Sequence, residues 1–83
     1  MGSKRFDGVL FVAYPNDHLP PHVHGFYAET EVIVELLNGT VRQALRDDAI
    51  RPPDAKKSDV TKILRTAARH ADELVELWRL ARG

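Results

Sequence analysis

Asn38-Gly39 lies between two apolar, β-branched segments and is the strongest turn signal in this chain of 83 residues. A two-residue β-hairpin turn of type I′ needs a positive φ at both central positions, and Asn-Gly meets this need at little steric cost. The dipeptide therefore predicts a hairpin of two strands, residues 31–37 and 40–45, with Leu36 opposite Val41.

This register divides the hairpin into an apolar and a polar face, because successive side chains of a strand point to opposite sides. On the polar face, Glu35 lies opposite Arg42, and we expect an exposed ion pair of modest stabilising effect. The apolar face is the predicted core face, with Gln43 as its polar exception. Its apolar members are Val32, Val34, Leu36, Val41 and Leu45.

Two further strands are predicted before the hairpin. Residues 9–14 are apolar and end at the turn residues Pro15-Asn16-Asp17, which is typical of a strand followed by a turn. Residues 23–28 form the second strand. A two-residue turn at Glu29-Thr30 would pair this strand with the hairpin and place His24 opposite Glu35.

The C-terminal part of the chain has apolar residues at helical spacing from Val60 to Ala81. Ser58 is the expected N-cap, and Asp59 suits the positive end of the helix dipole. We therefore expect an α+β fold in a single domain, residues 1–83. A small antiparallel sheet of about four strands packs against one long C-terminal helix that ends near Gly83, with Trp78 as a core anchor.

Composition narrows the classes of function. The chain has no cysteine, so disulfides and thiolate metal sites are excluded. Its longest apolar run, residues 9–14, is too short for a membrane span, and we expect a cytoplasmic protein without a signal peptide. The 12 basic and 12 acidic residues balance, and they alternate along the helix, which does not favour nucleic-acid binding.

Three of the four histidines lie between His18 and His24. Imidazole is the commonest metal ligand and titrates near neutral pH. His22 and His24 are two residues apart, so on a strand they point to the same side, where the expected register also places Glu35. Two histidines and a carboxylate are a ligand set for zinc or non-haem iron.

Three interpretations of this segment stay open. It binds a divalent metal such as zinc through His22, His24 and His18, or it uses histidine and Asp17 as acid–base partners or ligand contacts without metal. In the third interpretation the histidines only cap turns and bond backbone carbonyls. The candidate residues for a ligand or partner site are Asp17, His18, His22, His24, Glu35 and Arg42.

Two motifs occur in order along the chain. One is Asn16-Asp17-His18-x-Pro20-Pro21-His22-x-His24, and the other is His70-Ala71-Asp72-Glu73-Leu74 followed by Trp78. With these motifs the chain resembles a bacterial family catalogued as domain of unknown function 4160. The resemblance implies a bacterial, cytoplasmic protein, often encoded beside a second small protein as in toxin–antitoxin pairs. The resemblance implies that functional residues of the family would lie at Asp17, His18, His22 and His24, with His70 and Glu73 as weaker candidates.

Three functional hypotheses follow. The first is a small regulatory or protein-interaction module, one member of a toxin–antitoxin-like pair, that binds a small protein partner encoded nearby. The alternative is a metal-dependent or His/Asp acid–base hydrolase, such as a nuclease, centred on residues 17–24. The third is a sequence-tolerant nucleic-acid binder that uses the basic residues Arg42, Arg46, Arg51, Lys56 and Lys57. The sequence leaves open whether the protein is an enzyme.

Overall fold

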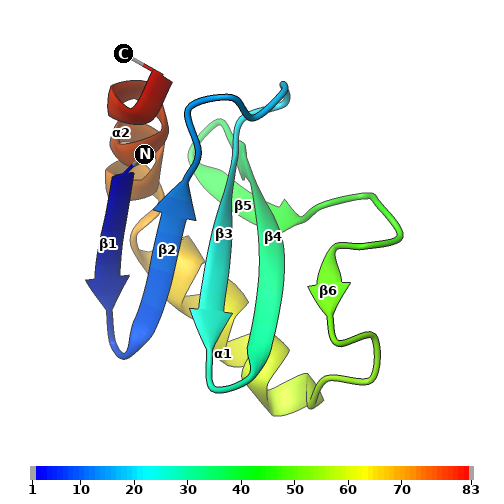
Figure 1. Ribbon diagram of the computed structural model, residues 1–83. Helices are drawn as coiled ribbons and strands as arrows, with labels where there is room; N and C mark the ends of the chain where they lie inside the picture. Colours follow the sequence, from blue (N-terminus) through cyan, green and yellow to red (C-terminus); the bar gives the residue numbers. More distant parts are fainter. Residues whose placement is uncertain (1, 83) are drawn as a thin grey trace.

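A single antiparallel sheet is covered on one face by two C-terminal helices in the computed structural model, which describes residues 2–82 (Figure 1). The strand order is β1-β2-β3-β4-β5, and β6 pairs with β4. The predicted α+β class is confirmed. The strands are β1 (Gly2–Phe6), β2 (Val9–Ala13), β3 (His22–Tyr27), β4 (Thr30–Leu37), β5 (Thr40–Gln43) and β6 (Ile50–Arg51), and the helices are α1 (Lys57–Arg69) and α2 (Ala71–Arg82).

The hairpin at Asn38-Gly39 is confirmed, since Leu36 lies opposite Val41 and Glu35 lies opposite Arg42 in the β4–β5 pairing. The turn type differs from the prediction. Of the two central residues only Gly39 takes a positive φ, 82°, and a type I′ turn needs a positive φ at both. The ion pair between Glu35 and Arg42 was also predicted to be exposed. This is wrong for Glu35, which is only 7% exposed.

Leu45 was expected in the core and is instead 79% exposed. Strand β5 ends at Gln43, and the short strand β6 takes the place beside Val32, which pairs with Ile50. The segment between β5 and β6 is hydrogen-bonded to the backbone of β4. The N–H of Ile33 donates to the Ala49 carbonyl at 2.8 Å, and the Ile33 carbonyl accepts from the Ala44 N–H at 3.0 Å. Ala44 and Ala49 of this segment form a small second apolar cluster with Ile33 of β4.

Strand β1 was not expected, because Gly2–Phe6 is largely polar and lacks the alternation of a half-buried strand. It pairs with β2 at the edge of the sheet, through a turn at Asp7-Gly8. Both turn residues take a positive φ, 51° and 83°. Asp-Gly before an apolar run is a hairpin signal, and it is the signal from which this strand could have been found.

The turn between β3 and β4 is Ala28-Glu29, not the expected Glu29-Thr30, and Tyr27 lies opposite Thr30. The pairing is therefore displaced by two residues, and His22, not His24, lies opposite Glu35. A displacement by an even number keeps every side chain on its expected face. His22 and His24 thus still share a face of the sheet with Glu35.

The single long helix of the prediction is two helices, separated at His70, whose φ of −123° and ψ of 30° are not helical. The His70 ring stacks on Phe6 of β1 with the ring centroids 4.0 Å apart. Both helices pack on the same sheet face, so the apolar spacing continues across the break and does not reveal it. Helix α1 begins at Lys57, so Ser58 is not its N-cap, and the expected helix end near Gly83 lies outside the described residues.

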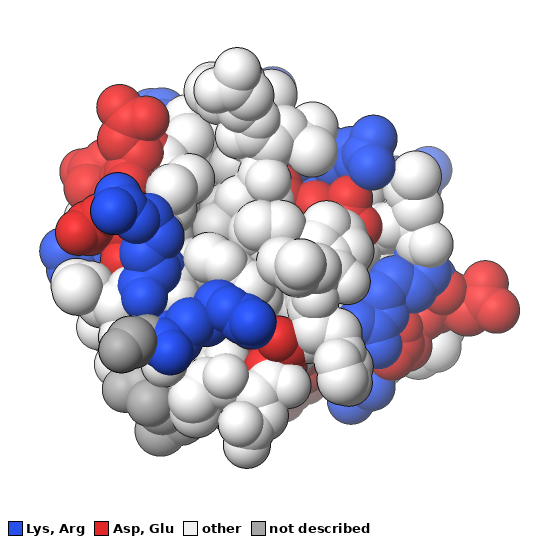
Figure 2. Space-filling view, turned by 90° about the horizontal axis from the view of Figure 1, so that it is seen from above, with Lys and Arg blue, Asp and Glu red and all other residues white. Residues whose placement is uncertain are grey.

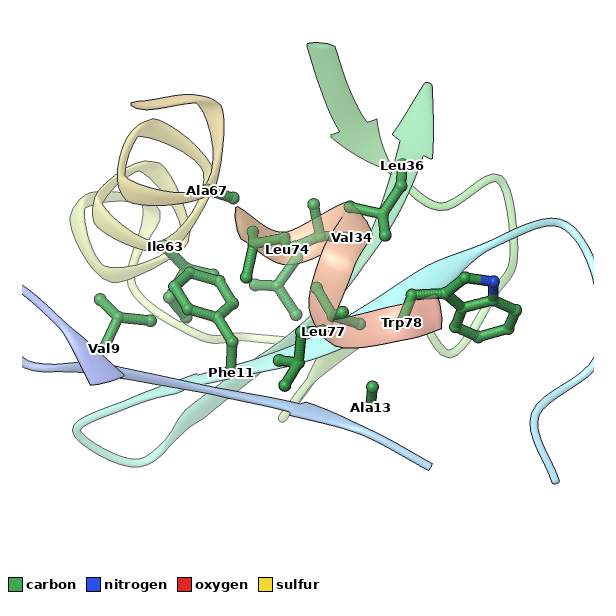
Figure 3. Close-up of a cluster of buried hydrophobic side chains, with 12 residues drawn as sticks. Val9, Phe11, Ala13, Val34, Leu36, Ile63, Ala67, Leu74, Leu77 and Trp78 are labelled. Atoms are coloured by element: carbon green, nitrogen blue, oxygen red, sulfur yellow. The ribbon is translucent and has the colours of Figure 1, made fainter. Parts of the chain in front are cut away.

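The core lies between the sheet and the two helices, where Phe11, Ile63 and Leu74 are fully buried (Figure 3). Trp78 is 5% exposed and belongs to the same cluster, which confirms it as a core anchor. In the part of the chain that the structure describes, neither helix has the length and hydrophobicity needed to cross a membrane.

Candidate metal centre

The candidate site lies at the start of β3 and in the loop that precedes it, residues 14–21, at the upper end of the sheet in Figure 1. The backbone N–H of Asp17 donates to the carbonyl of Tyr14 at 3.3 Å, which closes a turn after β2. At the other end of the loop, the carbonyl of Pro21 accepts from Leu36 N–H at 2.9 Å and so continues the β3–β4 pairing. The loop thereby returns over the strand that carries the two histidines.

Three potential ligand atoms converge here. Asp17 Oδ2 lies 3.2 Å from His22 Nε2 and 3.4 Å from His24 Nε2. The ligand atoms of the three residues all lie within 4.8 Å of one another. Among residues 2–82, Asp17 Oδ2 and His24 Nε2 are buried and find no hydrogen-bond partner. We call Asp17, His22 and His24 the His/Asp cluster.

The second nitrogen of each imidazole ring is already committed to an acceptor. His22 Nδ1 lies 2.9 Å from the carbonyl oxygen of Pro20, which can only accept, so Nδ1 carries the proton. His24 Nδ1 lies 2.9 Å from Glu31 Oε2, and a carboxylate there accepts in the same way. In a neutral imidazole each Nε2 then presents a lone pair to Asp17 Oδ2.

Three lone pairs that face one another need a proton or a cation between them. Additional protons would convert the histidines to imidazolium ions paired with Asp17. A metal ion would be held by two imidazoles and a carboxylate, with Pro20 and Glu31 as the outer partners that fix the two rings. Zinc at about 2.0–2.1 Å from tetrahedral ligands sets neighbouring ligand atoms about 3.3 Å apart. The two distances from Asp17 to the histidines, 3.2 and 3.4 Å, fit this spacing. The third distance, between the ligand nitrogens of His22 and His24, is at most 4.8 Å.

Two aromatic rings hold the histidine planes. Tyr14 meets His24 edge-on with the ring centroids 4.9 Å apart. The Trp78 ring lies 5.4 Å from the His22 ring, which connects the cluster to the hydrophobic core. Packing of this kind restricts the rotamers of both histidines and so fixes the positions of their Nε2 atoms.

A hollow of about 310 Å³ adjoins the cluster. Three protein ligands beside an open volume are typical of catalytic zinc sites, whereas structural sites are closed by a fourth protein ligand. Figure 2 views the molecule from this end and shows charges of both signs around a mostly uncharged centre. The hollow is lined by Asp17, His18, Leu19, Pro20, His22, His24, Ile33, Glu35, Ala44 and Arg46.

The other expected site residues lie outside the cluster. His18 is exposed and lines the hollow without joining the three converging ligand atoms. Glu35 accepts a hydrogen bond from Arg42 Nε at 2.9 Å, so the carboxylate of the cluster is that of Asp17. Sequence reasoning missed Glu31, although it shares the alternation of Ile33 and Glu35 on β4 and therefore their face.

Arg46 carries the guanidinium on the wall of the hollow. Its Nε and Nη2 donate to the two carboxylate oxygens of Asp48 at 2.8 and 2.9 Å. Arg51 donates to the same carboxylate at 3.3 Å. These hydrogen bonds, led by that of Arg46, lower the pKa of Asp48 below its ordinary value. Asp48 thus has two cationic partners, of which only Arg46 lines the hollow.

His70 and Glu73 lie beside Phe6 and Asp7 at the other end of β2 from the loop 14–21. His70 Nδ1 is 3.2 Å from Glu73 Oε2, and this hydrogen bond lowers the pKa of Glu73. The contact spans the start of α2, where Glu73 sits in the first turn. The pair therefore stabilises the junction of the two helices and is separate from the His/Asp cluster.

Comparison with known proteins identifies a family. A family model described as Domain of unknown function (DUF4160) matches residues 8–79, which include the His/Asp cluster and Trp78. No curated protein and no solved structure matches the chain.

Proposed function

The chain belongs to the DUF4160 family, whose description names no activity, and we propose from the site itself that Asp17, His22 and His24 bind a divalent metal ion. One observation carries this proposal: Asp17 Oδ2 lies 3.2 and 3.4 Å from the Nε2 atoms of two imidazoles whose Nδ1 atoms already contact acceptor oxygens. Zinc fits these nitrogen and oxygen ligands and this spacing.

The chemistry that best fits the site is hydrolysis. A divalent metal held by three protein groups acts as a Lewis acid and lowers the pKa of a bound water. The hollow beside the cluster has the size of a small ligand pocket, with Ile33 and Ala44 as apolar lining. This arrangement supports the hypothesis of a metal-dependent hydrolase over that of a histidine segment with only a structural role.

Arg46 indicates the class of substrate. A guanidinium on the wall of the hollow can hold a phosphate or carboxylate oxygen through two parallel hydrogen bonds. If Arg46 leaves Asp48 to bind a substrate oxyanion, Asp48 keeps its hydrogen bond from Arg51, so its charge still has a cationic partner. We therefore favour an ester that carries an oxyanion, such as a phosphodiester.

Zinc titration of tag-free, chelator-treated protein by calorimetry tests the metal site. We expect one zinc per chain, and we expect Asp17→Asn and His24→Ala to lose binding. His18→Ala is the matched control, because His18 belongs to the same segment and lies outside the cluster. If the unsubstituted protein binds no zinc, cobalt or manganese at millimolar excess, the proposal is wrong and the cluster is held together by protons.

Hydrolysis of bis(p-nitrophenyl) phosphate by the zinc-loaded protein tests the activity. Arg46→Gln should reduce the rate, whereas Arg51→Gln, which removes the other partner of Asp48, should not. A protein that binds zinc but leaves this ester and p-nitrophenyl acetate uncleaved would contradict the hydrolase and keep the metal site.

The interaction-module hypothesis stays a prediction, together with a protein partner encoded nearby and a bacterial cytoplasmic location. Nucleic-acid binding through Arg42, Arg46, Arg51, Lys56 and Lys57 also stays a prediction.

A further inference from the structure

The last turn of α2 touches the loop that supplies Asp17. Arg82 Nη1 donates a hydrogen bond of 2.6 Å to the backbone carbonyl of Asp17, across 65 positions of sequence. The turn bond from Asp17 N–H to Tyr14 stays within the loop, and the bond from Leu36 to Pro21 lies at its end. Arg82 therefore ties the middle of the loop to the helical layer.

The Arg82 guanidinium also contacts Trp78, whose ring packs against His22 of the cluster. Arg82 Cζ lies 4.8 Å from the centroid of the Trp78 ring, in a cation–π arrangement. Trp78 in turn lies 5.4 Å from His22. One arginine thus touches the residue that carries one ligand and the aromatic ring that packs on another.

We infer that Arg82 is a positioning residue of the metal site, an inference that rests on the proposed metal binding. Asp17 is the one member of the His/Asp cluster that comes from a loop, whereas His22 and His24 are fixed by β3. A loop ligand keeps its place only when other contacts hold the loop backbone. Arg82 supplies such a contact, and the buried Trp78 holds the guanidinium in place through the ring face.

Arg82 does not touch the ligand atoms themselves, so its loss should weaken the site without removing a ligand. Outer partners of metal ligands typically change metal affinity by about 10- to 100-fold. Arg82→Ala should therefore reduce zinc affinity by roughly 10-fold or more. Arg82→Lys should restore part of this loss, because an ammonium can donate to the carbonyl but cannot stack as a plane on Trp78.

The experiment compares Arg82→Ala, Arg82→Lys and the control Arg79→Ala by zinc calorimetry and by amide hydrogen exchange of metal-free protein. Arg79 is exposed on the same helix and pairs with Glu76, so its loss reports the general cost of removing a cation from α2. We expect weaker zinc binding and faster exchange of the Asp17 amide in Arg82→Ala, intermediate values in Arg82→Lys, and unchanged values in Arg79→Ala.

Equal zinc affinity and equal exchange in Arg82→Ala and the unsubstituted protein would overturn the inference. Absence of zinc binding in the unsubstituted protein would instead overturn the proposed function. In that event hydrogen exchange decides the role of Arg82 alone: faster exchange at Asp17 in Arg82→Ala supports positioning of the loop, and unchanged exchange refutes it.

Discussion

His24 Nδ1 lies 2.9 Å from Glu31 Oε2, and this contact turns the Nε2 of the same ring toward Asp17. The two residues are diagonal neighbours on paired strands, because His24 pairs with Ile33 and Glu31 lies two positions away on the same face. A carboxylate on the far side of an imidazole fixes its tautomer and raises its basicity as a ligand. Glu31 thus fixes the His24 ring with its Nε2 facing Asp17.

Glu31→Gln should weaken zinc binding by about 10- to 100-fold, the usual effect of losing an outer carboxylate. The fold should be unchanged, because Glu31 is only partly buried. Zinc calorimetry measures the affinity, and nitrogen NMR of the His24 ring reports its tautomer. Glu29→Gln, in the exposed turn next to it, is the control, and equal losses in both variants would contradict this role.

Trp78→Ala should lower the free energy of unfolding by about 3–5 kcal/mol, because it leaves a large cavity between α2 and the sheet. Denaturant unfolding measures this change. For a domain of marginal stability, such a loss is a large fraction of the total free energy of unfolding. Leu80→Ala is the control, since Leu80 is on the same helix and 69% exposed. A loss below about 1 kcal/mol would mean that Trp78 does not anchor the core.

Gly25→Ala should destabilise the protein by about 1–3 kcal/mol through overpacking. A Cβ at this position would lie 2.6 Å from Ile63 Cγ2 and 3.0 Å from Phe11 Cε1. Ile63→Leu removes the branched methyl group at the closer contact, so the double variant should recover part of the stability. Thermal unfolding of the single and double variants tests this, and additive losses would show that Ile63 is not the obstacle.

Glu73→Gln should destabilise the protein only above the acid range. The hydrogen bond from His70 lowers the pKa of Glu73 from its ordinary value of 4.5. A lowered pKa means that the ionised form stabilises the folded state above the ordinary value, and that this contribution is lost as pH falls through the lowered pKa. In denaturant unfolding, the variant and the unsubstituted protein should therefore differ at pH 6, and this difference should shrink as the pH falls below 4.5.

Some features of the fold depend on local pattern alone, and these could be predicted from the sequence. Asn38-Gly39 predicts its hairpin because turn geometry depends on a few adjacent residues. His22 and His24 point to one side because a strand alternates with a period of two, and the displaced pairing at Ala28-Glu29 preserved that side. Strand β1 was not predicted because its residues are largely polar, and an edge strand needs little apolar surface.

The tertiary structure alone decided which side chains meet. At the break between the two helices, the His70 ring stacks on Phe6, which is distant in sequence. Asp17, not Glu35, completes the His/Asp cluster, because the loop returns over β3 while Arg42 engages Glu35. Periodicity along a chain determines the direction of each side chain, whereas register and loop path depend on long-range contacts such as that of Arg82 with Asp17.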